Sequence, residues 1–290
     1  MTKRLLLVLC ASLLHAQSSV ESLLSDRLEQ NMAAYAKSVD GAFGYAAIDL
    51  TSGRVTMLNG NAVFAQASAI KIPILVTLFK DAENGRVKLD QTATLTAKDA
   101  VGGSGELQHK LKEASQTLTI SELALLMVRD SDNTATNVLI AKVGMERVNT
   151  LMASMGLKAT RLRRIMMDTP AALRGEENAS TPLEMARLAA MIHHGKVAGS
   201  AEILSLLMTV KAAVRAVVPP DIEVASKPGS IPGVHTETAI VYLKDRPFVL
   251  AVASAALGEK AANPIQGATR IVFEHFQRLG RVNTYGHRVK

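Results

Sequence analysis

The chain has 290 residues, of which 33 are Lys or Arg and 26 are Asp or Glu, giving a formal net charge of +7. The basic residues are scattered and aromatic residues make up only 3% of the sequence, so no platform for stacking nucleic-acid bases is available. The length is sufficient for one domain with a large core, or for two interleaved lobes. We therefore do not expect a nucleic-acid-binding protein.

Residues 1–16 have the pattern of a secretory signal peptide. Lys3 and Arg4 precede an apolar run over residues 5–14, and a cleavage site ends at Ala16. The run is too short to span a bilayer, and a leucine before Cys10 argues against a lipoprotein. We expect an exported bacterial protein, periplasmic or secreted, without stable membrane insertion, whose mature chain (17–290) has no cysteine.

The first part of the mature chain predicts a helix, two strands and a second helix. Apolar residues recur at helical spacing between Val20 and Tyr35. The segment from Phe43 to Asn59 has the character of two strands joined by a turn. The run from Ser68 to Lys80 is almost wholly apolar after Lys71, which is typical of a buried helix.

Helical patterns continue to about Val214 and are clearest over residues 122–129 and 180–193. From Asp221 the period becomes that of strands, over residues 222–225, 239–243 and 247–253, and a last helix follows from Asn263 to about Leu279. Strands near both ends and helices between them predict an α+β fold, in which one antiparallel sheet carries an inserted helical lobe.

Ser68 and Lys71 are the first candidate catalytic residues. They are three residues apart, so on a helix they project from the same face and the amine can reach the hydroxyl. A desolvated lysine with a lowered pKa can take the proton of a serine and make it a nucleophile. The alternative is a helix N-cap followed by a surface lysine.

Two further motifs follow in the order known for one group of serine enzymes. Ser131-Asp132-Asn133 lies roughly 60 residues after Ser68, and Lys227-Pro228-Gly229-Ser230 roughly 100 residues later. With the Ser-x-x-Lys tetrad, they resemble the signature of the class A serine β-lactamase family and its D-alanyl-D-alanine peptidase relatives. The resemblance runs from about Phe43 to the C-terminus and includes KIPILVTLFKDAENGRVKLD and Thr181-Pro182.

The resemblance implies a β-lactamase-like fold. Five strands flanked by the N- and C-terminal helices would form a sheet lobe, over about 20–67 and 215–290, and an all-helical lobe would cover about 68–214. The active site would lie in the cleft between the lobes, with Lys227 on an inner strand.

It also implies roles for individual residues. Ser68 would attack an amide carbonyl and become acylated, with the backbone N–H groups of Ser68 and Ser230 as the oxyanion hole. Ser131 would relay a proton to the leaving nitrogen, and Lys227 would raise the positive potential beside it. Asn133, with Gly229 and Ser230, would bind the substrate. The alternatives are an N-cap role for Ser131-Asp132-Asn133 and an ordinary turn at Lys227-Pro228-Gly229.

The sequence departs from the family where the substrate carboxylate is bound. Pro228 replaces the usual threonine or serine, and we expect Ser230 to take over that contact. His235 or Thr236 stands near the place where many β-lactamases present an arginine. Arg215 is a candidate substitute, although an arginine on a late helix is more often a surface residue.

A second departure concerns the base that hydrolyses the acyl-enzyme. Class A β-lactamases carry Glu-x-x-x-Asn in the loop before Thr181-Pro182, whereas this chain places Ile165 or Met166 where the glutamate belongs. Asp168 is the best candidate base by position. We expect Glu177-Asn178 to anchor the loop instead, with Asn178 bonded to Arg163 or Arg164.

We consider three functions. The first is a serine β-lactamase that opens β-lactams through a Ser68 acyl-enzyme. The second is a penicillin-binding D,D-peptidase or esterase that is acylated by β-lactams but deacylates slowly, and the third is a catalytically silent binding or sensor module. The intact set of Ser68, Lys71, Ser131 and Lys227 argues against the third.

We expect a monomer with a small-molecule β-lactam or cell-wall peptide as its substrate, and no metal or other cofactor. His193 and His194 are adjacent, so on a helix they cannot bind one ion from the same face. The glycine-rich stretch from Gly102 to Gly105 lacks the lysine of a phosphate loop. It would line the edge of the cleft or form an ordinary surface loop.

Overall fold

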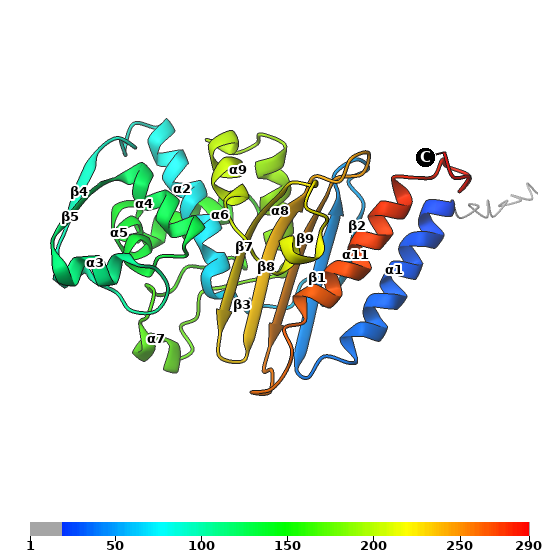
Figure 1. Ribbon diagram of the computed structural model, residues 1–290, viewed down its shortest axis with the longest axis horizontal. Coiled ribbons are helices and arrows are strands. Elements are labelled where there is room, and N and C mark those ends of the chain that lie inside the picture. Colours follow the sequence, from blue (N-terminus) through cyan, green and yellow to red (C-terminus); the bar gives the residue numbers. More distant parts are fainter. Residues whose placement is uncertain (1–18, 290) are drawn as a thin grey trace, which may run out of the picture.

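The computed structural model describes residues 19–289, so the expected signal peptide lies outside the described residues. At the centre is a five-stranded antiparallel sheet with the strand order β2-β1-β9-β8-β7 (Figure 1). The strands are β1 (Ala42–Asp49), β2 (Val55–Leu58), β7 (Val224–Ile231), β8 (Val234–Val241) and β9 (Phe248–Ala255). The predicted α+β fold, with one sheet built from both ends of the chain, is confirmed.

Strand β7 differs from the sequence prediction in two ways. It extends to Ile231, beyond the predicted end at residue 225, so Lys227, Pro228 and Gly229 lie within the strand and not in a turn. It also lies at the edge of the sheet, not in its interior as the resemblance implied. An edge position suits Pro228, because a proline has no N–H to donate to a second neighbouring strand.

The terminal helices α1 (Val20–Ala36) and α11 (Ile265–Leu279) lie side by side on one face of the sheet (Figure 1). Their apolar sides and the sheet enclose a hydrophobic core that includes Met32, Phe248 and Phe276. Near one end of the helix pair, the hydroxyl of Tyr35 donates to the carbonyl of Pro264 at 2.8 Å. The two ends of the chain are therefore fastened together.

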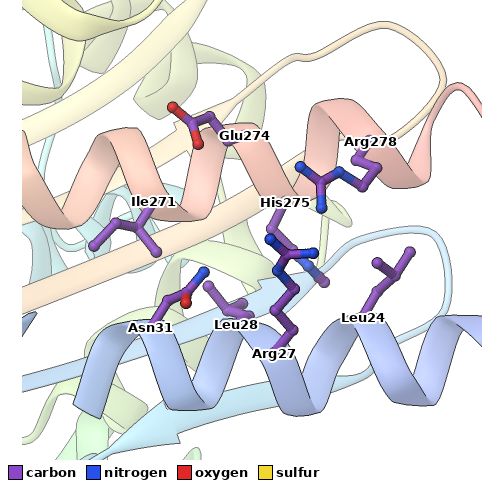
Figure 2. Close-up of a pocket in the computed structure, with 8 residues that line it drawn as sticks. All are labelled: Leu24, Arg27, Leu28, Asn31, Ile271, Glu274, His275 and Arg278. Atoms are coloured by element: carbon purple, nitrogen blue, oxygen red, sulfur yellow. The ribbon is translucent and has the colours of Figure 1, made fainter. Parts of the chain in front are cut away.

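A shallow hollow remains between α1 and α11 (Figure 2). Arg27 from α1 reaches toward His275 of α11, and Arg278 lies at the same end of the hollow. Burial lowers the pKa of His275 to about 4, with Asp49 opposing the shift and Arg246 adding to it, so the ring is neutral at physiological pH. This hollow lies across the sheet from α2 (Figure 1).

The other elements build the second lobe and the far face of the sheet, except α10 (Ala213–Val217), which packs against α11 on the near face. The helices are η1 (Ala67–Ile70), α2 (Lys71–Glu83), η2 (Ala97–Asp99), α3 (Leu107–Glu113), α4 (Ile120–Arg129), α5 (Asn133–Val143), α6 (Met145–Ser154), α7 (Thr169–Leu173), α8 (Pro182–His193), α9 (Ser200–Met208) and α10 (Ala213–Val217). Two short ribbons pair β3 (Phe64–Ala65) with β6 (Ala179–Ser180), and β4 (Thr92–Leu95) with β5 (Gln116–Thr119).

Helix α2 is the element that the second lobe surrounds. From Lys71 to Phe79 every residue is buried, in contact with a core formed by α4, α5, α6 and α8. Helix α8 packs directly on β1, β8 and β9. Burial of both flanks of α2 fixes its first residue against the edge of the sheet, which positions the site described next. Within the described part of the chain, no helix is both long and apolar enough to span a bilayer.

Candidate active site

Ser68 lies in η1, immediately before α2. The sequence predicted one continuous helix from Ser68, but Ala67–Ile70 form a 3-10 turn and the α-helix begins at Lys71. Ala67 has φ +45°, a left-handed conformation that residues other than glycine rarely adopt and that clusters at functional sites. The turn leaves Ser68 partly exposed on a cleft, while Ala69 and Ile70 are fully buried.

Lys71 is fully buried, and its amine bonds the loop between α4 and α5. Nζ donates to the carbonyl oxygen of Ser131 at 2.6 Å, to Ser131 Oγ at 3.0 Å and to Asn133 Oδ1 at 3.0 Å. Among the described residues no hydrogen bond joins Nζ to Ser68, although such bonds often form only when substrate is present. Burial, and next the charge of Lys227, lower the pKa of Lys71 well below its usual range, while Asp132 opposes the shift.

The Ser131-Asp132-Asn133 loop has both an N-cap and a side chain directed at the buried amine. Asp132 caps α5, because its Oδ1 accepts the N–H of Ala135 at 2.9 Å, and its Oδ2 accepts the N–H of Leu107 at 2.9 Å. Ser131 has φ +54°, and this left-handed turn brings its hydroxyl to Lys71. The capping role therefore belongs to the middle residue and leaves Ser131 available for chemistry.

Asn133 is bonded on both sides of its amide. The oxygen accepts from Lys71, and Nδ2 donates to the carbonyl of Gly102 at 2.9 Å. Gly103 and Ser104 line the cleft next to it, so the glycine-rich stretch forms the edge of the cleft. The amide hydrogens that we expected to reach a substrate are partly used to hold that edge in place.

Strand β7 brings Lys227, Gly229 and Ser230 to the same region. A Cβ on Gly229 would lie 2.8 Å from the backbone nitrogen of Ala69 and 2.7 Å from Thr236 Oγ1, so the strand runs directly against η1. Lys227 is almost fully buried, and its amine donates to the carbonyl of Pro228 at 3.3 Å. Burial lowers the pKa of Lys227 to about 8, although the charge of Glu237 raises it.

These segments enclose a cleft of about 480 Å³. Its lining comprises Ala67, Ser68, Gly103, Ser104, Asn133, Arg164, Met166, Met167, Asp168, Thr169, Ala172, Glu177, Asn178, Ser230, Ile231 and Pro232. Ser68, Asn133 and Ser230 thus share one cavity, with the amine of Lys71 hydrogen-bonded to Asn133 behind its surface. A cleft-lining serine one turn before a buried amine of lowered pKa, and a second serine bonded to that amine, can together carry out acyl transfer.

The sequence matches the β-lactamase enzyme family over residues 27–276. The chain belongs to this family. It is 27% identical over 260 residues to β-lactamase CTX-M-8 of Citrobacter amalonaticus, a match that covers 86% of this chain and 88% of that protein.

Solved structures of this fold agree with that assignment. A β-lactamase from Sphaerobacter thermophilus is 28% identical, covers 88% of this chain and 97% of its own, and has a TM-score of 0.79. PBP-A has a TM-score of 0.78 at 24% identity, with coverage of 88% of this chain and 96% of its own. At that identity the likeness to PBP-A shows the fold alone.

The loop between α6 and α8 is held in place by Asn178. Asn178 anchors it by accepting the backbone N–H groups of Arg163 at 2.8 Å and Arg164 at 3.1 Å, and by donating to the carbonyl of Arg164 at 3.0 Å. Arg164 also forms an ion pair with Glu177 at 3.0 Å. The expected anchor is therefore present, although Asn178 bonds the backbone of the arginines rather than their guanidinium groups.

Of Ile165 and Met166, the two residues expected where the family's glutamate belongs, Met166 is the one that lines the cleft. It is 7% exposed, whereas Ile165 is 40% exposed. Asn137 of α5 holds it there: its side-chain oxygen accepts the N–H of Met166 at 2.7 Å, and its Nδ2 donates to the Met166 carbonyl at 3.1 Å. Sequence reasoning missed Asn137, although it follows Asn133 by four residues and so shares its helix face.

Asp168 lines the cleft, and it also caps α7. Its Oδ1 accepts the N–H of Ala171 at 3.0 Å. Asp168 therefore lines the cleft from the N-terminus of a short helix. If it acts as a base, it must do so while one of its oxygens also caps α7.

Of the residues expected near the substrate carboxylate, Ser230 lines the cleft, whereas Thr236 and Arg215 do not. Ser230 Oγ lies 3.1 Å from Nδ1 of His235, at the wall of the cleft. Thr236 faces η1, where its hydroxyl donates to the carbonyl of Gln66 at 2.9 Å. Arg215 donates to the carbonyls of Pro219, Pro220 and Ile222 at 2.6–3.1 Å, and it is not among the cleft-lining residues.

Sequence reasoning also missed Glu237. It is fully buried on β8, where it pairs with Pro228 of β7. A single glutamate within a strand pattern gave no indication that its carboxyl would be buried. Over the described residues, no group of three or more His, Cys, Asp or Glu side chains is arranged to hold a metal ion.

Proposed function

We propose that this β-lactamase-family protein opens the amide of β-lactams through an acyl-enzyme on Ser68. Ser68, which precedes Lys71 by three residues, lines the cleft. The observation that carries the proposal is the hydrogen bond of 3.0 Å between the buried amine of Lys71 and Oγ of Ser131. Such an amine is neutral more readily than an exposed lysine, so it can accept a proton at neutral pH.

Acylation then follows from the residues present. Neutral Lys71 takes the proton of Ser68 as Oγ forms a bond with the lactam carbonyl carbon. The resulting tetrahedral intermediate collapses, the C–N bond breaks, and the lactam nitrogen receives a proton. Ser131 is the donor, because its hydroxyl is hydrogen-bonded to the amine that holds the proton and can be recharged from it.

Charge stabilisation comes from strand β7 and the 3-10 turn. The backbone N–H groups of Ser68 and Ser230 are the proposed oxyanion hole, and the close approach of Gly229 to Ala69 supports their proximity. Lys227 supplies positive potential for the substrate carboxylate, and Ser230 with His235 offers hydrogen bonds at the cleft wall.

Asp168 is our proposed base for deacylation, because its carboxylate lines the cleft. Met166, which stands where the base was expected in the same loop, has a side chain that cannot take up a proton. The alternative is a D,D-peptidase or esterase that is acylated by β-lactams and deacylates slowly. The observation that favours this alternative is Met166 itself, an apolar side chain held in the cleft by Asn137.

Nitrocefin and a fluorescent penicillin distinguish these functions. Sustained nitrocefin turnover supports a β-lactamase, a stable penicillin adduct with little turnover supports the alternative, and no reaction with either contradicts both. Ser68→Ala is expected to abolish the adduct, and labelling that survives would show that Ser68 is not the nucleophile.

Asp168→Asn separates the base from the cap, because asparagine caps helices about as well as aspartate. We expect turnover to fall at least about 100-fold if Asp168 is the base. Glu177→Gln, which changes the other carboxylate that lines the cleft, is the matched control. Parental turnover in Asp168→Asn would exclude Asp168.

We further infer that residues 1–16 are removed on export and that the mature protein acts as a monomer. The support for export is the charge and apolar pattern of the N-terminus. N-terminal sequencing of protein recovered from the periplasm tests the first inference, and light scattering tests the second.

A further inference from the structure

The cleft that holds Ser68 has an apolar side that the proposed reaction does not use. The side chains come from the loop that carries α7 and from the end of β7 with the turn after it. We call them the apolar wall, which consists of Met166, Met167, Ala172, Ile231 and Pro232. The wall and Ser68 line one cavity of about 480 Å³, a size typical of sites that bind small molecules.

No lining residue among those described presents an uncompensated positive charge. The charged residues of the lining are Arg164, Glu177 and Asp168. Arg164 and Glu177 form an ion pair at 3.0 Å, and Oδ1 of Asp168 accepts the N–H of Ala171. A charged group of a substrate would have to leave water for the carbon and sulfur atoms of the wall, which is costly, whereas an apolar group gains from the same transfer.

Large apolar side chains continue along the loop outside the cavity. Ile165, Met167 and Leu173 are 40%, 54% and 85% exposed. They lie within one short stretch of the chain, and Met167 also lines the cleft. Exposed apolar side chains grouped next to a cavity are typical of a surface that binds an apolar ligand.

The side chain of Met167 reaches across the cleft. Its φ is +63°, in the left-handed region that residues other than glycine rarely adopt. A Cβ on Gly103 would lie 3.1 Å from Sδ of Met167 and 2.8 Å from Nδ2 of Asn133. The thioether therefore lies against the glycine-rich edge, beside the amide of Asn133. Because a methionine side chain is flexible, it can move aside and pack against an entering apolar group.

Polar contacts fix the backbone of the loop. Asn137 bonds the N–H and the carbonyl of Met166 at 2.7 and 3.1 Å, and the N–H of Thr169 donates to the carbonyl of Met167 at 2.9 Å. Left-handed conformations that neighbouring contacts hold in this way cluster at ligand-binding sites. The wall is therefore formed before a substrate binds, which lowers the cost of binding one.

We propose that the apolar wall is a substrate subsite that selects acyl donors with a large, uncharged aryl or alkyl group on the acyl side of the reacting amide. Met167 and Ile231 are its specificity-determining residues, one on the loop and one on β7. The inference rests on the proposed function, which places the carbonyl at Ser68. It adds the class of substrate to that function.

The first experiment varies only the substrate. Penicillins with a methyl, heptyl or benzyl side chain, and the α-carboxy and α-amino derivatives of the benzyl compound, compete with fluorescent penicillin for Ser68. We expect the heptyl and benzyl compounds to acylate at least about tenfold faster than the methyl compound, because each buried methylene contributes to binding. Both charged derivatives should react more slowly than the benzyl compound. Equal rates for methyl and benzyl, or a faster reaction of either charged derivative, overturn the proposal.

The second experiment varies the wall. Met167→Gln and Ile231→Thr replace apolar side chains by polar ones of similar size, and each should lower the ratio of the benzyl rate to the methyl rate about fivefold. Met208→Gln, which alters an exposed methionine of α9, is the matched control and should keep the parental ratio. Variants of the wall that slow both substrates equally leave the ratio unmoved, which would show a structural role and overturn the proposal.

The third experiment does not need acylation. In Ser68→Ala protein carrying ¹³C-methyl methionine, the resonances of Met166 and Met167 are identified with Met166→Leu and Met167→Leu. Phenylacetylglycine, which carries the benzyl group on an amide, should shift both resonances at millimolar concentration, and acetylglycine should shift neither. Unshifted resonances overturn the subsite. Shifted resonances in a protein that no penicillin labels would support the subsite and contradict only the proposed acylation.

Discussion

Nζ of Lys71 lies 3.0 Å from Oγ of Ser131, although 60 residues separate them in the chain. The contact joins the first residue of α2 to the loop between α4 and α5, and the left-handed conformation of Ser131 makes it possible. One buried amine therefore links the turn that carries Ser68 to the opposite wall of the cleft.

Ser131→Ala should slow acylation at least about 100-fold, because the proton on Lys71 would lose its path to the leaving nitrogen. The measurement is the second-order rate of labelling by fluorescent penicillin. Ser104→Ala, which removes another cleft-lining hydroxyl, is the control and should retain most of the rate. Comparable losses in both variants would argue against a relay through Ser131.

Gly229→Ala should nearly abolish acylation. The added Cβ would meet the backbone of Gln66 and Ala69, and these atoms cannot rotate away as a side chain can. Strand β7 would have to move from η1, which would separate the proposed oxyanion donors. Gly102→Ala is the matched control, since the nearest atom to its Cβ would be 3.9 Å away. Penicillin labelling and thermal unfolding measure the two effects.

Met166→Glu should shorten the lifetime of the acyl-enzyme at least about tenfold, because it places a proton acceptor in the cleft. The hydrogen bonds of Asn137 to the backbone of residue 166 would hold the new side chain there. Ile165→Glu is the control, since that side chain is 40% exposed. The decay of the penicillin adduct is measured after removal of free ligand. Faster decay in Ile165→Glu alone would mean that the other residue occupies the position of the base.

Lys227 should make the free energy of unfolding rise with pH. Its native pKa of about 8 lies below the usual 10.5. Between these two pH values the unfolded chain binds more protons than the native protein, so a rise in pH favours the native protein. We expect Lys227 to contribute a gain of about 3 kcal/mol over this range, since one pKa unit corresponds to about 1.4 kcal/mol.

Urea unfolding at about pH 8 and about pH 10 measures most of that gain. Lys227→Met should lose this share and keep the share due to Lys71, whose pKa is also lowered. Lys80→Met, which alters a partly exposed lysine paired with Glu83, should keep the whole parental difference. An equal pH difference in the parent and Lys227→Met would show that Lys227 is not the source.

Local sequence patterns were enough to predict the fold class and three walls of the site. The change from helical to strand periodicity after Asp221 predicted the sheet, because alternation and helical spacing bury different faces of a chain. The motifs that begin at Ser68, Ser131 and Lys227 named side chains that the structure brings to one region. Acyl transfer was indicated by the resemblance of the three motifs, in their order and spacing, to the signature of the family.

Which of these groups contact each other became clear only from the folded chain. The edge position of β7, the 3-10 turn at Ser68 and the choice of Met166 over Ile165 depend on long-range packing, which no local pattern records. The same holds for burial: Glu237 is an ordinary strand residue in sequence, and only the folded sheet encloses its carboxyl group beside the start of α10, away from water.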